Sequence, residues 1–492
     1  MGVERLSAGD DRLLTPGQTC WRVSRAHQFA CIIDGADYFR HVKSAMLRAR
    51  HRIMLIGWDF DARMTFERGT KMLPGPNQLG AFLYWMLRKR PGLEVYLLKS
   101  NLRLLPAFDG IWFRLSRVAL VNQISSKRMH FAIDGAHPTG SVHHQKIVVI
   151  DDEVAFCGGI DLTVGRWDTR AHGHESHRRR TLGRGYGPRH DVAAAVDGAA
   201  ARALGEQALA RWRTATRQSL RPVEAQHSAW PSKLDPTFRN VDVGIARTLP
   251  ELDDRSEVRE VEALNRAAIA AARHTIYLEN PYLAARGVVD ALAARLREAD
   301  GPEIVIVIAR RGNNPLERAA MDSARHRLIQ LLWEADEYRR LGIYWPVTDG
   351  GTPIYVHSKV LVADDRLLRI GSSNLNNRSM GFDSECDVAI EAEWDDADHE
   401  DVRRQILSVR DELVSEHLGV AQGDFDQAMR RDGSLLKAVE ALRGDGRSLR
   451  LFTERTVADE AGPLAESDLV DPDRVPRSLT RSVQRFIAGL RN

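Results

Sequence analysis

Apolar positions recur along the chain in the same order in two places. Residues 38–50 and 261–273 carry apolar side chains at intervals of three and four, which predicts amphipathic helices. Short apolar runs follow at 53–58 and 276–279 and predict buried strands. A second helix and strand then follow in each half: 79–90 with 93–98, and 288–298 with 304–309. This alternation predicts an α/β fold whose sheet is flanked by helices.

The repeated order indicates a duplicated chain. Ala49-Arg50-His51 ends the first predicted helix, and Ala272-Arg273-His274 ends its counterpart. Prolines and weak periodicity between the halves predict a linker. We therefore expect an N-terminal half at 1–215, a linker at 216–239, a C-terminal half at 240–420 and an extension at 421–492.

A second repeat carries the candidate chemistry. Each half contains the pattern His-x-Lys-x4-Asp, and a glycine follows each histidine fourteen positions later. The chain holds nine lysines against 61 arginines, so two lysines at the same spacing are improbable by chance. The residues are His144, Lys146 and Asp151, followed by Gly158, and His357, Lys359 and Asp364, followed by Gly371.

Strand geometry divides the motif into two parts. Residues 142–150 alternate as a strand, and residues two apart on a strand share a face. His144 and Lys146 therefore point the same way, and so do His357 and Lys359. Each motif aspartate lies seven residues from its histidine, on the opposite face. Asp151 and Asp364 are accordingly predicted to be structural.

Two imidazoles and two ammonium groups in one pocket suit cleavage of a phosphodiester. One imidazole can attack phosphorus while the other protonates the leaving oxygen. The lysines offset the charge on the phosphoryl oxygens, so no metal or other cofactor is expected. A nucleophilic histidine needs an acceptor on its other ring nitrogen. Asp191 and Glu385, at the starts of two matching strands, are the candidates, and their pairing stays open.

Composition and charge limit the partners and the compartment that we expect. The net charge is +3 and no apolar run reaches the ~18 residues of a membrane span, so neither nucleic acid nor a membrane anchor is expected. Four scattered cysteines predict neither a disulfide framework nor a zinc site, and they favour a cytoplasmic enzyme. Residues 170–190 hold six arginines and four histidines. This stretch is either a cationic lip for phosphate head groups or a solvated loop.

The motifs resemble the phospholipase D superfamily, which is defined by a doubled His-x-Lys-x4-Asp motif, and within it the phosphatidylcholine-hydrolysing branch. The stretches that carry the resemblance are 143–151, 158–162 and 165–168 in the first half, and 277–282, 370–376, 378–380 and 383–385 in the second. Pro281 stands where that branch usually has Gln. The resemblance implies two pseudo-symmetric α/β sandwich halves, each a mixed sheet flanked by helices, with the active site at their interface.

The resemblance also implies a covalent phosphohistidine, with His144 as nucleophile and His357 as acid. It implies that Gly159, Asp161, Ser372 and Asn374 contact the substrate phosphate. We therefore expect a monomeric phospholipase D acting on phospholipid, peripheral at a membrane surface. A phosphatidyltransferase of the cardiolipin synthase type, a nuclease of the same superfamily and an inactive membrane-association protein are the alternatives.

Overall fold

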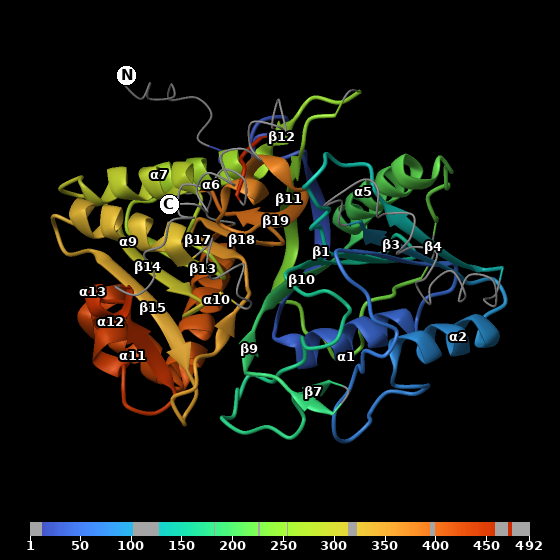
Figure 1. The fold of residues 1–492 in the computed structure, drawn as a ribbon, viewed down its shortest axis with the longest axis horizontal. Coiled ribbons are helices and arrows are strands. Elements are labelled where there is room, and N and C mark those ends of the chain that lie inside the picture. The colour runs from blue at the N-terminus through green and yellow to red at the C-terminus, as the bar shows by residue number, and fades with distance from the viewer. Residues whose placement is uncertain are drawn as a thin grey trace, which may run out of the picture.

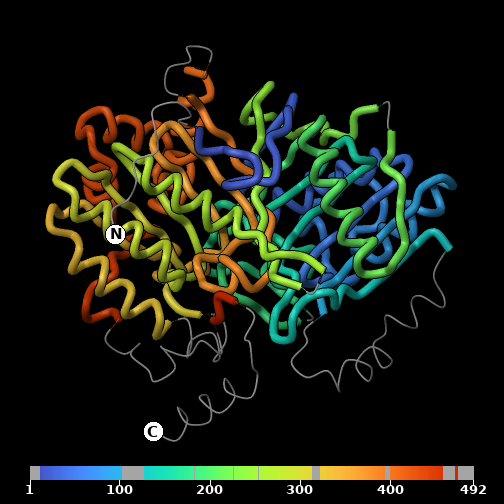
Figure 2. The backbone as a smooth tube through the Cα atoms, turned by 90° about the horizontal axis from the view of Figure 1, so that it is seen from above, coloured from blue at the N-terminus to red at the C-terminus, as the bar shows by residue number. Residues whose placement is uncertain are grey.

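The computed structural model describes residues 12–101, 127–181, 183–224, 227–252, 254–312, 322–393, 399–457 and 471–474. Figure 1 shows the first half of the chain, in blue to green, beside the second half, in yellow to red. Figure 2 shows the same side-by-side arrangement from above. A single large sheet runs through both halves.

Seven strands of this sheet come from the first half. Their order is β1-β10-β6-β5-β2-β3-β4, and β2, β3 and β4 are parallel while the remaining pairs are antiparallel. The bounds are β1 (Arg22–Ile33), β2 (Arg52–Gly57), β3 (Glu94–Ser100), β4 (Met129–Asp134), β5 (Ile147–Ile150), β6 (Val154–Gly158) and β10 (Val192–Asp197). The helices are α1 (Gly35–Met46), α2 (Leu79–Lys89) and α5 (Gly198–Thr216).

The second half repeats the order in mirror image as β11-β19-β18-β17-β13-β14-β15. The bounds are β11 (Phe238–Leu249), β13 (Thr275–Asn280), β14 (Glu303–Ile308), β15 (Leu341–Val347), β17 (Val360–Ala363), β18 (Leu367–Gly371) and β19 (Glu385–Glu391). The helices are α6 (Glu260–Ala271), α7 (Arg286–Leu296), α9 (Ser323–Ala335), α10 (Glu400–Leu418) and the π-helix η2 (Arg378–Phe382). Shorter strands are β7 (Arg180–Thr181), β8 (Arg184–Gly185), β9 (Arg189–His190), β12 (Val258–Arg259) and β16 (Tyr355–Val356).

The antiparallel pair β1–β11 joins the two halves at the centre of the sheet, with Phe29 opposite Phe238. Each strand of the first half then has a counterpart at the same distance from this pair. The predicted fold class, two pseudo-symmetric α/β halves with a mixed sheet flanked by helices, is confirmed.

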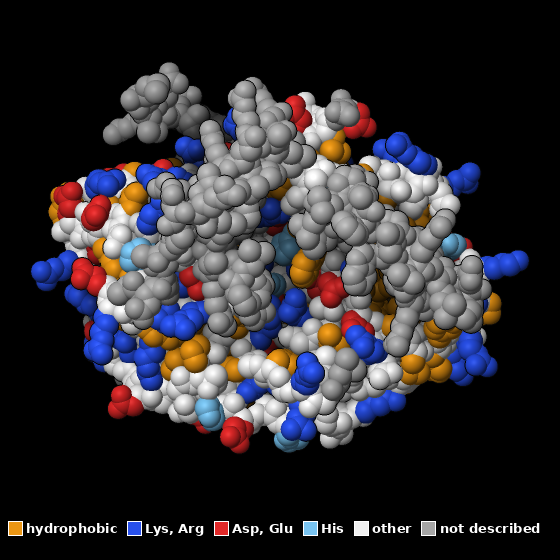
Figure 3. Space-filling model, in the orientation of Figure 1, with side chains coloured by type: hydrophobic (Ala, Val, Ile, Leu, Met, Phe, Trp, Pro, Cys, Tyr) orange, Lys and Arg blue, Asp and Glu red, His pale blue; other side chains and the backbone are white. Residues whose placement is uncertain are grey.

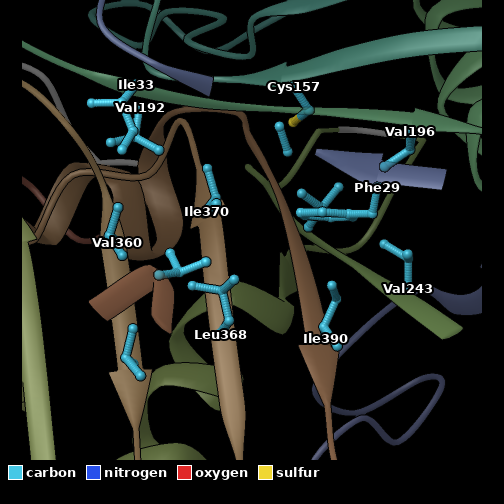
Figure 4. Close-up of a cluster of buried hydrophobic side chains, with 14 of the residues drawn as sticks. Phe29, Ile33, Cys157, Val192, Val196, Val243, Val360, Leu368, Ile370 and Ile390 are labelled. Atoms are coloured by element: carbon cyan, nitrogen blue, oxygen red, sulfur yellow. The ribbon is translucent and has the colours of Figure 1, made fainter. Parts of the chain in front are cut away.

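Three buried clusters hold the layers together. Helices α1 and α2 cover one face of the first half, and α6, α7 and α9 cover one face of the second. The opposite face is continuous across both halves and is covered by α5 and α10. Figure 4 shows this shared cluster, with Phe29 and Val192 from the first half and Val360 and Ile370 from the second. Each buried side chain of this size stabilises the fold by roughly 1.5–3 kcal/mol.

The predicted helices and strands of both halves are present with small shifts, but one boundary prediction was wrong in a way that matters. The strand predicted over 142–150 begins only at Ile147. Residues 143–146 run outside the strand because their backbone contacts come from the other half of the chain. In the predicted linker 216–239, Thr216 ends α5, and β11 has already begun at Phe238.

Part of the predicted extension packs on the second half. Helices α11 (Gln422–Asp432) and α12 (Leu435–Leu442) precede β20 (Ser448–Leu451), which pairs with β15, and α13 (Glu454–Val457) follows. The Ser434 hydroxyl donates to Glu303 at the start of β14. Residues 458–470 and 475–492 lie outside the described residues. Among the described helices, none combines the length and apolar character that crossing a bilayer demands.

Candidate active site

The two motif segments lie where the halves meet, and each is held by the opposite half. The His144 backbone N–H donates to Ser384 O at 2.9 Å, and that of His357 donates to His190 O at 2.8 Å. Short backbone pairings between the halves support both contacts: His143 bridges to Ser384, and β16 pairs with β9 in parallel. The fold therefore brings together two motifs that are 213 positions apart in sequence.

The histidine side chains are paired crosswise in the same way. His144 Nδ1 lies 3.0 Å from Glu385 Oε1, and His357 Nδ1 lies 2.7 Å from Asp191 Oδ2. Each carboxylate thus belongs to the half opposite its histidine, which settles the pairing left open by the sequence. A carboxylate at Nδ1 keeps the proton there and leaves Nε2 available for chemistry. Both histidine side chains are 13% exposed.

Both lysines fold back onto their own motif segment. Lys146 Nζ donates to His144 O at 2.9 Å and lies 3.3 Å from Asp161 Oδ2, and Lys359 Nζ donates to His357 O. Burial lowers the pKa of His144 and of His357 well below the usual range, and each lysine lowers both values further. Each ammonium group therefore acts on both imidazoles, as expected for one shared site.

Burial also shifts the charged partners towards neutrality. It raises the pKa of Glu385 to about 8 and that of Asp191 to about 6, against the opposing effect of nearby lysines. Burial lowers the pKa of Lys359 to about 7, with Lys146 and Arg189 adding to the shift. An anion entering this pocket would restore the charge on the cations.

The four residues predicted to contact phosphate have different surroundings. The Asp161 carboxylate accepts from the backbone of Trp58 at 3.0 Å and also meets Lys146. Ser372 Oγ donates to Glu385 Oε2 at 2.5 Å, so its hydroxyl is engaged in orienting that carboxylate. A side-chain carbon at Gly159 would overlap Asp191 Oδ1, so glycine is required there for close approach. Asn374 Oδ1 is buried and without a hydrogen-bond partner.

The motif aspartates make matching structural contacts. Asp151 accepts from the backbone N–H groups of Arg50, His51 and Arg52 at 2.6–2.8 Å. Asp364 accepts from the counterparts Arg273, His274 and Thr275 at 2.7–2.8 Å. Each aspartate has a positive φ of 53° and secures the chain as it enters β2 or β13. The strand parity used for the prediction does not apply, because β5 begins only at Ile147; these backbone contacts are instead what supports a structural role.

Several groups near the motifs were not predicted from the sequence. The guanidinium of Arg189 lies over the Tyr355 ring, which in turn lies 6.1 Å from the His357 ring. Arg166 and Arg189 both lower the pKa of His357. The Trp58 ring lies 6.4 Å from that of His144 and is 37% exposed. Arg189 could have been found as the neighbour of His190-Asp191, whereas Tyr355 and Trp58 carry no sequence signal.

The arginine- and histidine-rich stretch 170–190 is divided between surface and interior. Arg178, Arg180 and Arg184 are exposed on or beside the β7–β8 hairpin, whereas His172, Arg179 and His190 are buried. The exposed arginines of this stretch are therefore those on or beside the hairpin. Next to it, Val164, Gly165 and Tyr186 help to line a hollow of about 560 Å³. Figure 3 shows many Lys and Arg side chains in blue on the lower part of this face.

Histidine and carboxylate groups able to hold a metal ion lie around His190 among the described residues, and they include none of the four motif residues. The four cysteines are free thiols.

Comparisons with known proteins agree with the fold and the motifs. Residues 45–280 match the family model described as Phospholipase D, and residues 266–406 match the model described as Cardiolipin synthase, PLD-like domain. Phospholipase D A of Dictyostelium discoideum is 25% identical over 354 residues, covering 56% of this chain and 27% of that protein. Phospholipase D delta of Arabidopsis thaliana is 23% identical over 566 aligned positions, covering 80% of this chain and 65% of that protein.

A solved structure, that of phosphatidylserine synthase from Haemophilus influenzae Rd KW20, covers 95% of this chain and 96% of its own, with a TM-score of 0.53 and 13% identity. At that identity the likeness concerns the fold. The chain spans about a quarter to two thirds of the length of the two relatives above. The paired family models, the doubled motif and the mirror-image sheet together show that the chain belongs to the phospholipase D superfamily.

Proposed function

We propose that the chain is a phospholipase D that transfers the phosphatidyl group of a glycerophospholipid to water or another alcohol. The observation that supports this most strongly is the crosswise pairing of His144 with Glu385 and of His357 with Asp191. Two oriented imidazoles beside two ammonium groups suit a double displacement at phosphorus. The imidazole and ammonium groups of this set are not the oxygen ligands that Mg²⁺ prefers.

In the first step, His144 Nε2 attacks phosphorus and a P–N bond forms. The bond from phosphorus to the head-group oxygen breaks, and His357, in its protonated form, gives that oxygen its proton from Nε2. The entering phosphodiester anion supports this state, because it raises the pKa of the imidazole that burial and the lysines lower.

In the second step, neutral His357 takes a proton from water or an alcohol, whose oxygen attacks phosphorus. The P–N bond breaks, His144 is released, and phosphatidic acid or a new phosphatidyl ester leaves. Lys146 and Lys359 stabilise the negative charge on the phosphoryl oxygens in both steps. The assignment of His144 as nucleophile follows the family resemblance.

A phosphatidyltransferase is the second candidate. It is favoured by the match of residues 266–406 to a model described as Cardiolipin synthase, PLD-like domain. The two candidates share the first step and differ in the acceptor that resolves the phosphohistidine. We also propose that the chain acts as a monomer, because both motifs lie in one chain. We propose that its first half ends with α5 at Thr216, that its second half begins with β11 at Phe238 and ends at 420, and that 421–492 is an extension.

The decisive experiment supplies vesicles of phosphatidylcholine, phosphatidylethanolamine or phosphatidylglycerol with and without ethanol. Phosphatidic acid, phosphatidylethanol and cardiolipin are measured together, and single-stranded DNA serves as a nuclease control. Phosphatidic acid with phosphatidylethanol supports the hydrolase, and cardiolipin from phosphatidylglycerol supports the synthase. DNA cleavage without lipid turnover would contradict both. His51→Ala, at an exposed histidine outside the site, should match wild type, and His144→Ala should lack activity.

A further inference from the structure

A second group of histidines and carboxylates lies buried beside the site. Asp34 follows β1, His172 and His190 belong to the connection between β6 and β10, and Glu416 lies on α10 of the other half. One ligand atom from each lies within 4.8 Å of all the others. All four side chains are at most 3% exposed.

The ligand atoms have the spacing of a closed tetrahedral site. His172 Nε2 lies 3.1 Å from Asp34 Oδ2 and 3.3 Å from Glu416 Oε1. His190 Nδ1 lies 3.2 Å from the same Glu416 oxygen and 3.3 Å from Asp34 Oδ1. Ligands about 2.0–2.2 Å from a tetrahedral zinc ion lie about 3.3–3.6 Å from one another. The distances from His172 and His190 to Glu416 Oε1, and from His172 to Asp34 Oδ2, are therefore close to those between ligands of one bound ion.

Each histidine is oriented by a further carboxylate on its other ring nitrogen. His172 Nδ1 lies 3.1 Å from Asp168 Oδ2, and His190 Nε2 lies 3.0 Å from Glu279 Oε2. A carboxylate behind a histidine is the usual arrangement for histidines that bind zinc, because it sets the tautomer and increases the basicity of the ligand nitrogen.

Glu416 uses one oxygen for the fold and turns the other towards the histidines, whereas Asp34 presents one oxygen to each histidine. Asp34 Oδ1 accepts from the Asp191 backbone N–H at 3.1 Å, and Glu416 Oε2 pairs with Arg170 at 2.5 Å. Asp34 Oδ2 is buried and faces His172 Nε2 at 3.1 Å.

The backbone at two of the four residues is also unusual. Asp34 has φ 68° with ψ 156°, a region adopted almost entirely by glycine, and His172 has φ 42°. Non-glycine residues held in such conformations cost of order 1–3 kcal/mol each, and they persist where other interactions hold them. A metal ion bound by both side chains is such an interaction.

We propose that Asp34, His172, His190 and Glu416 form a structural site for a divalent transition metal, with zinc the best match. Two neutral imidazoles and two carboxylates give a neutral centre with a 2+ ion, which removes the charge otherwise buried there. Four protein ligands leave no open position, so the ion would act on structure. Because His190 O accepts from the His357 backbone, the metal would hold β9 and the predicted catalytic segment in register.

The test measures metal directly, independent of any lipid activity. Untagged protein is produced in zinc-supplemented medium, gel-filtered in metal-free buffer and analysed by mass spectrometry for zinc. We expect about one zinc per chain in wild type and less than a tenth of that in His172→Gln. The matched control is His41→Gln, because His41 is a buried histidine of α1 that belongs to no group able to hold a metal ion among the described residues, and it should keep about one zinc.

A second measurement covers the case in which His172→Gln does not fold. Wild-type protein is stripped with a chelator and loaded with Co²⁺. Intense visible absorption of tetrahedral Co²⁺ is expected, together with a fall in melting temperature of several degrees on stripping that zinc reverses. Absence of zinc as isolated, together with no Co²⁺ spectrum and no change in melting temperature, would overturn the proposal and leave the cluster as an ion-pair network.

Discussion

The two halves place the same strands around their motifs but connect them very differently. In the first half, residues 159–191 separate β6 from β10 and include the β7–β8 hairpin and β9. In the second half, the shorter stretch 372–384 joins β18 to β19 and contains η2. The strands are alike because they position the imidazoles. The connections lie outside the sheet, where changes in length leave the core intact.

The difference extends to how each histidine is oriented. Glu385 accepts from Ser372 and Ser379 of the short connection, at 2.5 and 2.7 Å, in addition to its contact with His144. Asp191 is one methylene shorter and follows the buried cluster around His190 directly. The Glu385 carboxylate is thus held by serine hydroxyls, whereas the Asp191 carboxylate accepts from the backbone N–H of Val192 at 3.0 Å.

The largest expected effect comes from the two histidines. His144→Ala and His357→Ala should each reduce lipid turnover by about 10⁴-fold, because both halves serve one reaction. A substrate with a p-nitrophenyl leaving group distinguishes the roles, since such a group departs without an acid. His357→Ala should then keep a burst of p-nitrophenol equal to the enzyme concentration, and His144→Ala should show none. The opposite result would exchange the two roles.

The next effect concerns the carboxylates. Asp191→Asn and Glu385→Gln should each lower kcat by about 10²- to 10³-fold with little change in KM, because the tautomer of the partner histidine is no longer enforced. Steady-state kinetics with the exposed Asp242→Asn as control measures this. Equal activity of either variant and wild type would show that crosswise pairing is not needed for turnover.

The motif aspartates offer a matched test of stability. Asp151→Ala and Asp364→Ala each remove three hydrogen bonds from backbone N–H groups to a buried carboxylate. Each should lower the free energy of unfolding by about 3 kcal/mol, because leaving a buried donor unsatisfied costs about 1–3 kcal/mol. Urea denaturation measures the loss of stability, and kcat is measured at temperatures below the unfolding transition. A loss of kcat with unchanged stability would contradict the structural role.

A buried histidine distinguishes α1 from α6. Burial lowers the pKa of His41 to about 4, with Arg40 adding to the shift, and Leu264 stands at the matching place in α6. The unfolded chain takes up a proton near pH 6.5 that the folded chain refuses until about pH 4, so stability falls as pH falls through this range. Between pH 7.5 and 5 this side chain should account for about 2 kcal/mol, from about 1.4 kcal/mol per pH unit. In His41→Leu, the free energy of unfolding measured by urea denaturation should lack this part of its pH dependence. The same pH dependence in His41→Leu and wild type would contradict the prediction.

The smallest effect concerns the hairpin found only in the longer connection. Arg180→Ala should weaken binding to vesicles containing phosphatidylserine by about 5-fold, since one arginine near an anionic surface contributes about 1 kcal/mol. Sedimentation at low salt measures it, with the exposed Arg239→Ala of β11 as control. Equal losses in both variants would assign the effect to overall charge.

Much of this architecture follows from local pattern. The helices and strands of both halves and the duplication follow from periodicities of two and 3.6 residues. Asp191 and Glu385 were also found this way, as the first charges of matching strands. Such signals survive in sequence because they depend on neighbours within a few positions.

The crosswise contacts were decided by tertiary structure. The exchange of Asp191 and Glu385 between halves, the use of Ser372 to orient Glu385, and the gathering of Asp34, His172, His190 and Glu416 depend on the pairing of β1 with β11. These partners are up to several hundred residues apart, and no periodicity records which pairs meet. Only when the shared core closes over both faces of the sheet do burial and proximity select one partner for each side chain.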